Sequence, residues 1–185
     1  EENGYFEAAR KENLSKKPFS MIVPPPNVTG ILHIGHATNT TVLDIIARYK
    51  KLCGYDVLFL ADMDHAGIAT QAKVEEKLRK EGKDKYEMGR EAFLDEAWKW
   101  KEEHGDYISK QWRALGLSLD YSKERFTLDP KMCVAVNRVF KTLYDQGLIY
   151  RGERIINWDP VLKTALSDIE VTYSQDNGHF YYFKY

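Results

Sequence analysis

The sequence predicts an α/β fold built on parallel strands. Two short, largely apolar runs at 19–23 and 57–61, the second of them uninterrupted, are typical of strands, and the apolar residues between them follow helical spacing. Strand, helix and strand in this order form a βαβ unit with a right-handed crossover and two parallel strands. Ligands bind such sheets beyond the carboxyl ends of the strands, so the loops 24–36 and 62–71 are the candidate site.

The three elements of this unit have recognisable ends. Prolines at 24–26 follow the first strand, and proline cannot donate a hydrogen bond to a sheet. The helix covers 37–51 and ends at Gly54, because glycine adopts a left-handed backbone most easily. The second strand is apolar at every position, which predicts burial on both faces of the sheet.

The segments after the βαβ unit are mostly helical. Apolar spacing predicts helices over 70–81 and 86–115, the longer one with a possible break at Gly105. A further helix covers 129–147, since Asp129 is a capping acceptor and a proline follows it in the first turn.

The last part of the chain is β-rich. We expect strands in three stretches, which are 149–158, 169–173 and 180–185. The Asn-Gly pair at 177–178 lies between the last two stretches and is a hairpin signal.

Composition and charge narrow the classes of function. With 27 basic and 28 acidic residues the net charge is −1, so binding nucleic acid is not the chief task of this chain. No apolar run approaches the roughly 20 residues that span a bilayer, so no membrane segment is expected. Cys53 and Cys133 lie far apart in sequence, and we predict reduced, partly buried thiols in a cytoplasmic protein.

The segment 33–36, with the sequence HIGH, starts the first predicted helix. A helix amino terminus offers unpaired N–H groups and partial positive charge, which favour phosphate. Gly35 removes a side chain where a base or ribose could approach the backbone. His33 and His36 could donate hydrogen bonds to the charge that develops when the α-phosphate of ATP is attacked. The pattern indicates an ATP site with these two histidines as catalytic residues.

Two other interpretations of the histidines remain open from the residues alone. His33 and His36 could bind a metal ion, with Asp64 and His65 completing the ligands, in a metal-binding protein. They could also be paired structural histidines with no ligand.

Longer motifs surround these residues. The segment 24–30 reads PPPNVTG and is followed closely by a leucine and HIGH, and 64–71 reads DHAGIATQ. Near the end, 157–160 reads NWDP and 163–171 reads KTALSDIEV. In these motifs and their order the chain resembles the valyl-tRNA synthetases, a family of class I aminoacyl-tRNA synthetases. The likeness covers nearly the whole chain and departs from the family at Asp62, where glycine is usual.

The resemblance implies a Rossmann-like nucleotide-binding parallel sheet with helical additions, of which this chain holds the first half. Residues 1–171 would be the amino-terminal half of the catalytic (HIGH) domain, and 172–185 the beginning of a β-rich inserted editing domain. Residues 157–160 would be scaffold at the junction. The family's lysine-rich KMSKS loop does not occur in this sequence, so we expect a fragment that is nearly inactive alone.

The activity implied by the resemblance is that of a valine–tRNA ligase. Such an enzyme joins valine to ATP, releases pyrophosphate and passes the valyl group to tRNA(Val), and the family edits mischarged tRNA. The partners would be valine, ATP with Mg²⁺, tRNA(Val) and the remainder of the same polypeptide, without a membrane or a tightly bound cofactor. A HIGH-type small-molecule nucleotidyltransferase is the alternative enzyme.

Site residues carry over from the family onto the matching motifs. The ATP-binding residues would be those of the HIGH motif, namely His33, Gly35 and His36. Asn27 and Asp64 would hold the ammonium group of valine, and Pro25 would line the amino-acid pocket. A buried ammonium needs a carboxylate and other acceptors, because its desolvation is otherwise costly. Asp64 could also cap a helix that starts near Ala66.

Overall fold

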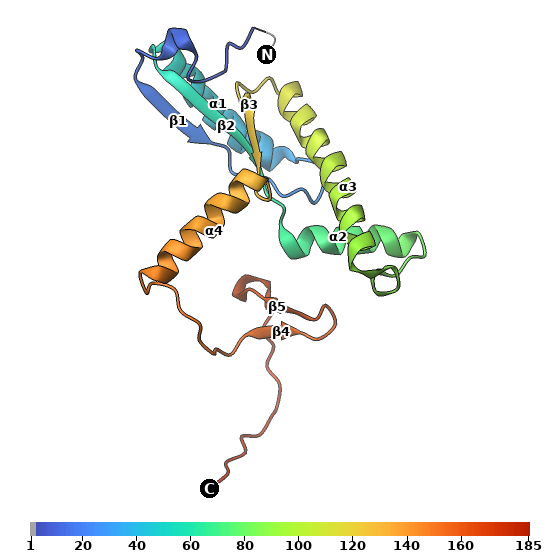
Figure 1. The fold of residues 1–185 in the computed structure, drawn as a ribbon. Helices are drawn as coiled ribbons and strands as arrows, with labels where there is room; N and C mark the ends of the chain where they lie inside the picture. Colours follow the sequence, from blue (N-terminus) through green and yellow to red (C-terminus); the bar gives the residue numbers. More distant parts are fainter. Residues whose placement is uncertain (1–2) are drawn as a thin grey trace. The chain divides into compact units, whose positions relative to one another are not determined.

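The computed structural model describes residues 3–185, and its first part contains a three-stranded parallel sheet (Figure 1). The strands, in the spatial order β1-β2-β3, are Pro18–Ile22, Asp56–Met63 and Asp120–Phe126. β1 and β2 pair in parallel from Pro18 beside Asp56 to Ile22 beside Leu60. Helix α1 (Ile34–Leu52) connects them, which confirms the predicted βαβ unit.

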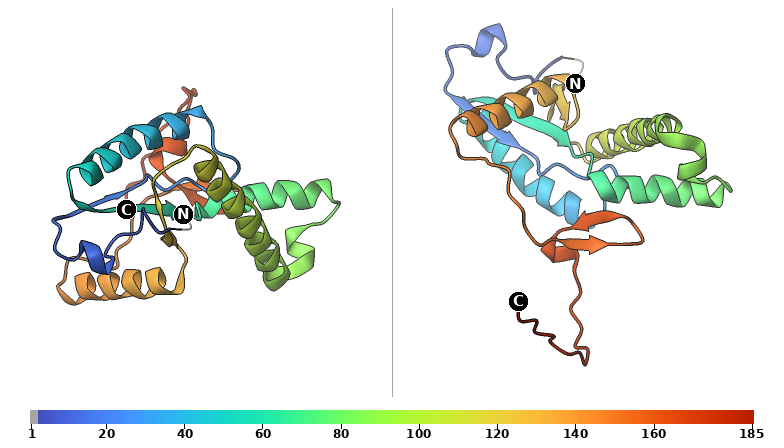
Figure 2. Two further views of the ribbon diagram at one scale, coloured as in Figure 1. Left: turned by 90° about the horizontal axis from the view of Figure 1, so that it is seen from above. Right: turned by 60° about the horizontal axis from the view of Figure 1, so that its bottom comes forward.

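Helix α1 packs along β1 and β2 (Figure 2). Its buried residues are few and mostly polar, and Asp44 among them accepts hydrogen bonds from the N–H and the hydroxyl of Ser118 at 2.6 and 2.5 Å. The helix ends as predicted, with Gly54 at a φ of 86°. The apolar residues whose spacing predicts the helix are exposed instead of buried: Val42, Ile45, Ile46, Tyr49 and Leu52.

The hydropathy pattern of the sequence does not predict strand β3. Its sequence, DYSKERF, is mostly polar, and only its first and last residues, Asp120 and Phe126, are buried. It pairs in parallel with the end of β2, so that Phe126 lies beside Met63. Pairing with a buried neighbour, rather than its own apolar content, makes this segment a strand.

Two helices follow β2 as predicted. They are α2 (Gly67–Lys80) and α3 (Lys85–Ala114), and they pack against each other (Figures 1 and 2). The predicted break at Gly105 is wrong, because this residue is helical and buried. The helical backbone is interrupted at Gly89 instead, where φ is 79° and ψ is 168°. Glycine tolerates this conformation because it has no Cβ.

The hydrophobic core combines residues of the sheet with the second half of α3. Trp112 and Ile108 of α3 are fully buried. They belong to one cluster with the buried side chains of the strands and loops, among them Val23, Val28, Phe59, Ala61, Met63, Leu119 and Phe126. The core therefore reaches the point where the loops leave β1 and β2.

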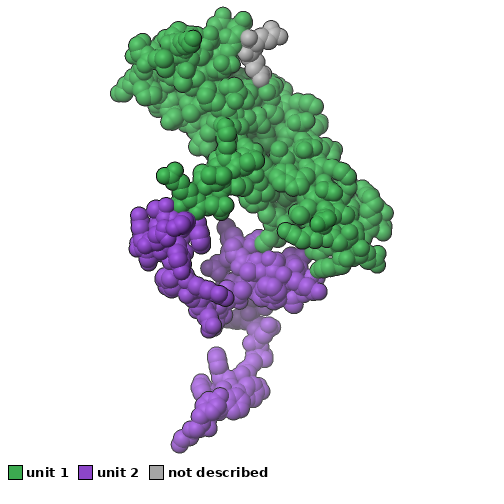
Figure 3. All heavy atoms as spheres, viewed as in Figure 1, with its two compact units in different colours: residues 1–139 green, residues 140–185 purple. Residues whose placement is uncertain are grey.

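Residues 1–139 and 140–185 form separate compact units (Figure 3). Helix α4 (Pro130–Asp145) confirms the last predicted helix, and Gly147 follows it with a φ of 72°. In the second unit β4 (Asn157–Asp159) and β5 (Thr164–Leu166) form an antiparallel pair. The division after Val139 differs from the expected domain boundary at 171, and the assignment of 172–185 to an inserted domain stays a prediction.

The strands expected in the last part of the chain are wrong, except that β4 occupies the end of 149–158. Among the described residues no strand follows Leu166, and the pair at 177–178 makes no hairpin. The segment 169–173 begins in a 3₁₀ turn, and Phe180 is 90% exposed. A β-prone sequence becomes a strand only where a partner accepts its hydrogen bonds, and an isolated two-stranded pair is marginally stable.

Both cysteines are free thiols, as predicted. Cys133 is half-buried, but Cys53 is exposed because it lies at the exposed carboxyl end of α1. Within residues 3–185, no helix has both the length and the apolar character needed to cross a membrane.

Candidate active site

Two loops leave the carboxyl ends of β1 and β2 and are joined by backbone hydrogen bonds. The N–H of Asp64 donates to the carbonyl of Pro26 at 2.9 Å, and the N–H of Val28 donates to the carbonyl of Asp64 at 3.0 Å. These bonds form a parallel bridge between Asn27 and Asp64. The structure thus brings together the two residues expected to hold an ammonium group. Pro25 lies exposed in the same loop.

The two histidines of the HIGH segment cap α1 reciprocally. Nδ1 of His33 accepts from the N–H of Gly35 at 3.1 Å, and Nδ1 of His36 accepts from the N–H of His33 at 3.2 Å. The ring centroids lie 4.0 Å apart. Because each Nδ1 is an acceptor, each neutral ring carries its proton on Nε2 and can donate it to a ligand.

This reciprocal capping changes the expectation that unpaired backbone N–H groups at the start of α1 would bind phosphate. Two backbone N–H groups, those of His33 and Gly35, are already bonded to imidazole nitrogens. A phosphate here would therefore meet Nε2–H donors at these positions. A Cβ on Gly35 would lie 3.0 Å from Cε1 of His33, so the glycine makes room for this ring. Burial, followed by the neighbouring His33, lowers the pKa of His36, which keeps its ring neutral.

Side chains of α3 hold the loop between the bridge and the HIGH segment. The indole N–H of Trp100 donates to the carbonyl of Val28 at 2.8 Å. The side-chain amide of Gln111 accepts from the N–H of Leu32 at 2.8 Å and donates to its carbonyl at 3.3 Å. The sequence gives no local signal for Gln111, and the helical spacing marks Trp100 only as a core residue.

The carboxylate of Asp64 is partly accessible, with 35% of the side chain exposed. Its Oδ1 accepts from the hydroxyl of Thr127 at 3.2 Å. The interpretation of Asp64 as a helix cap is wrong. The N-cap of α2 is Ala66, which has a left-handed backbone with a φ of 50° and makes no side-chain cap. The Asp64 carboxylate therefore faces Thr127, the His65 ring, whose Nδ1 lies 3.4 Å from Oδ1, and solvent.

The sequence matches a family model. The model described as tRNA synthetases class I (I, L, M and V) matches residues 1–182. The chain belongs to this family. This match decides against the two other candidates, the small-molecule nucleotidyltransferase and the metal-binding protein.

The curated proteins that are similar to this class I synthetase chain include bacterial valine–tRNA ligases. The chain is 61% identical over 184 residues to the one of Halalkalibacterium halodurans and 62% identical over 181 residues to the one of Bacillus subtilis. The alignments cover 100% and 98% of the chain, but 21% and 20% of the two relatives. The chain therefore spans about a fifth of the length of the curated relatives it matches.

A solved synthetase supports the α/β class I fold. The chain superposes on the agnB2 LeuRS of Agrobacterium radiobacter K84, solved as a ternary complex with tRNA and LeuAMS, with a TM-score of 0.68. The sequences are 28% identical, and the match covers 85% of this chain and 18% of that one.

Asp62 places a further carboxylate near the end of β2 in this synthetase chain. The residue is 7% exposed, and its Oδ1 accepts from the N–H of Met63 at 2.8 Å. Burial raises the pKa of Asp62, and the neighbouring carboxylates of Asp129 and Asp64 also raise it. The departure from the family's glycine therefore adds a buried acidic group two residues from Asp64.

A small cavity of about 120 Å³ borders the loop that follows β2. Its lining is largely apolar and includes Val28, Trp98 and Phe126, together with His65 and Thr70. The Thr70 hydroxyl is buried and has no hydrogen-bond partner within residues 3–185. Nowhere within residues 3–185 do three or more His, Cys, Asp or Glu side chains lie close enough together to hold a metal ion.

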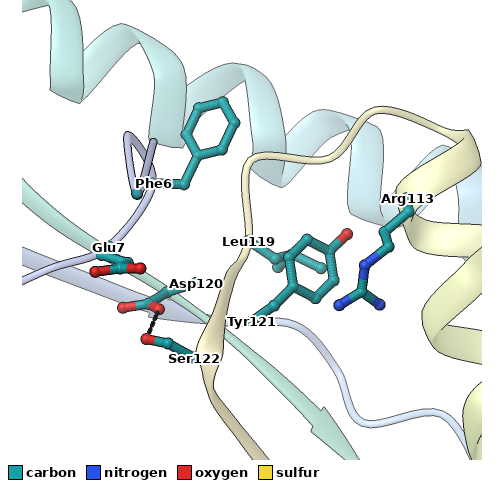
Figure 4. A pocket seen from close by; sticks show the side chains of 8 residues that line it. Phe6, Glu7, Arg113, Leu119, Asp120, Tyr121 and Ser122 are labelled. Atoms are coloured by element: carbon teal, nitrogen blue, oxygen red, sulfur yellow. Dashed lines mark hydrogen bonds between the residues drawn. The ribbon is translucent and has the colours of Figure 1, made fainter. Parts of the chain in front are cut away.

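Another cavity, of about 220 Å³, lies at the beginning of β3 (Figure 4). Asp120 in its wall is buried and accepts from the Ser122 hydroxyl at 2.5 Å and from the N–H of Ala8 at 3.0 Å. The ammonium of Lys123 lies 2.6 Å from the same carboxylate. These bonds tie the amino-terminal segment to β3, at the end of the strand opposite to the bridge between Asn27 and Asp64.

Proposed function

We propose that the protein containing this chain is a valine–tRNA ligase, which activates valine with ATP and transfers it to tRNA(Val) in the cytoplasm. The observation that carries the proposal is the identity above 60% with bacterial valine–tRNA ligases. It extends over 98% or more of the chain and so includes both loops of the candidate site.

Valine activation forms a phosphorus–oxygen bond and breaks another. A carboxylate oxygen of valine attacks the α-phosphorus of ATP, and pyrophosphate leaves with the electron pair of the broken bond. Negative charge grows on the α-phosphate oxygens during this step. His33 and His36, whose Nδ1 atoms accept backbone hydrogen bonds, would donate hydrogen bonds to it from Nε2. Mg²⁺ bound to the triphosphate would supply additional positive charge.

The bridge between Asn27 and Asp64 supports the ammonium site. Asp64 would supply the negative charge that a partly desolvated ammonium requires, and the Asn27 amide oxygen would be a neutral acceptor. Backbone hydrogen bonds hold the two residues side by side, so their side chains start from neighbouring positions when a ligand binds. Pro25, two residues before Asn27, would line the same pocket.

Transfer and editing require the remainder of the polypeptide. A hydroxyl of the terminal adenosine of tRNA(Val) attacks the carbonyl carbon of valyl-adenylate, and AMP leaves. An apolar pocket sized for valine cannot strongly reject threonine, which has the same shape and one hydroxyl. We therefore propose that the full-length protein also hydrolyses mischarged tRNA.

The test is substrate-dependent ATP–pyrophosphate exchange by the full-length protein. Valine should support exchange with a higher kcat/KM than isoleucine or threonine, and tRNA(Val) should then be charged. Exchange that is equally fast with isoleucine, or that does not respond to any amino acid, would contradict the proposal.

A further inference from the structure

Thr127 reaches the candidate ammonium site from a distant part of the sequence. It follows β3, and its N–H donates to the carbonyl of Met63 at 3.1 Å, which continues the pairing of β3 with β2. Asp64 is the next residue after Met63. Parallel pairing of β2 and β3 therefore places the Thr127 side chain beside the Asp64 carboxylate.

The hydroxyl of Thr127 uses its whole hydrogen-bonding capacity at this place. It accepts from the backbone N–H of His65 at 3.0 Å, lies 2.6 Å from Nδ1 of His65 and donates to Oδ1 of Asp64 at 3.2 Å. A hydroxyl has one proton and two lone pairs. All three bonds form at once when Nδ1 of His65 is a donor. The hydroxyl proton is then committed to Asp64.

We propose that Thr127 is a positioning residue for valine binding, which holds the Asp64 carboxylate in the orientation that receives the ammonium group. This inference rests on the proposed role of Asp64. A carboxylate attached only through its own side chain can rotate, and the Thr127 hydroxyl fixes Oδ1. The second oxygen, Oδ2, is then presented to the ligand. His65 supports the same carboxylate, because its two N–H groups orient the hydroxyl and its Nδ1 lies 3.4 Å from Oδ1 of Asp64.

Burial is consistent with a site that is both supported and open. Thr127 and His65 are half-buried, and the Asp64 side chain keeps 35% of its surface exposed. The ring of Phe126 packs edge-on against His65, with centroids 6.4 Å apart. The supporting groups are thus held by packing, while the carboxylate retains a free face.

The experiment compares two variants of the full-length protein in ATP–pyrophosphate exchange. Thr127→Val keeps the shape of the side chain and removes the hydroxyl, whereas Thr127→Ser keeps the hydroxyl. We expect Thr127→Val to raise the KM for valine about tenfold, the order expected for losing a hydrogen bond to a charged group. The KM for ATP should stay within about twofold, and Thr127→Ser should stay within about threefold of wild type for valine. If Thr127→Val does not fold, Thr127→Ala carries the same expectation.

A second background separates positioning from a structural role. In an Asp64→Asn protein, Thr127→Val should add less than about twofold to the KM for valine, because the carboxylate it positions is absent. An equal loss in both backgrounds, a raised KM for ATP, or no rescue by Thr127→Ser would overturn the inference.

The same experiment distinguishes the inference from the function on which it rests. If Asp64→Asn leaves the KM for valine unchanged, the ammonium role of Asp64 is wrong, and the role of Thr127 is wrong with it. If Asp64→Asn raises this KM and neither Thr127→Val nor Thr127→Ala does, only the role of Thr127 is wrong.

Discussion

Gln111 pairs with both backbone groups of Leu32, the residue immediately before His33. Its side-chain amide accepts from the Leu32 N–H at 2.8 Å and donates to the Leu32 carbonyl at 3.3 Å, as a neighbouring strand would. Gln111 lies 79 positions further along the chain, on α3. The entry of the chain into the HIGH segment is therefore fixed by a helix that is remote in sequence.

Removing this pair should impair catalysis through His33. Gln111→Met has a similar length but cannot bond, and it leaves two backbone groups of the half-buried Leu32 unpaired. We expect a loss of about 1–3 kcal/mol in stability and a fall of about tenfold in kcat for ATP–pyrophosphate exchange. Gln111→Glu keeps the acceptor for the Leu32 N–H and should be intermediate. A Gln111→Met protein with wild-type kcat would show that the pair has no catalytic consequence.

Gly35 should be sensitive to a single added methyl group. The Cβ of Gly35→Ala would lie 3.0 Å from Cε1 of His33 and would push this ring from its cap. We expect kcat for exchange to fall at least about tenfold while the protein stays folded. Gly105→Ala is the matched control, since its Cβ would make an ordinary contact of 3.5 Å with the Met63 sulfur. It should keep full activity, and a comparable loss in both variants would count against the His33 explanation.

Asp62 should make stability depend on pH. Burial raises the pKa of Asp62 in the folded protein above its ordinary value of 3.8. At a pH below that value Asp62 is protonated in both the folded and the unfolded chain, so no charge is buried on folding and stability is not reduced. As the pH rises through the folded-state pKa, the unfolded chain ionises more readily and stability is lost.

Asp62→Asn should therefore raise the melting temperature at pH 7. The corresponding increase in the free energy of unfolding should be on the order of 1 kcal/mol. The amide oxygen can still accept from the Met63 N–H, so the local geometry is kept. The difference between variant and wild type should shrink as the pH is lowered toward 4. A difference that is constant from pH 7 to pH 4, measured by thermal unfolding, would refute the buried-charge explanation.

The sequence predicts the βαβ unit and the two site loops because their signals are local. Apolar runs, the prolines at 24–26 and Gly54 each act within a few residues, and the structure confirms the elements they define. The pairing of Asn27 with Asp64 follows from parallel strands ending at one edge of the sheet.

The parts that the sequence does not predict depend on contacts between distant segments. β3 is polar along most of its length, and only its pairing with β2 makes it a strand. Thr127 and Gln111 reach the site through β3 and α3, so no motif could mark them. The error at the end of the chain has the opposite cause, since Phe180 and its neighbours are β-prone but have no strand partner within the described residues.

Valine recognition through Asp64 is best measured as the binding of a non-hydrolysable valyl-adenylate analogue to the full-length protein. Calorimetry would compare it with the isoleucyl analogue and with an Asp64→Ala variant. We expect tighter binding of the valyl analogue, with most of that affinity lost in Asp64→Ala because the ammonium loses its carboxylate. Equal binding of both analogues would show that this site does not select valine, and unchanged affinity in Asp64→Ala would show that Asp64 does not hold the ammonium group.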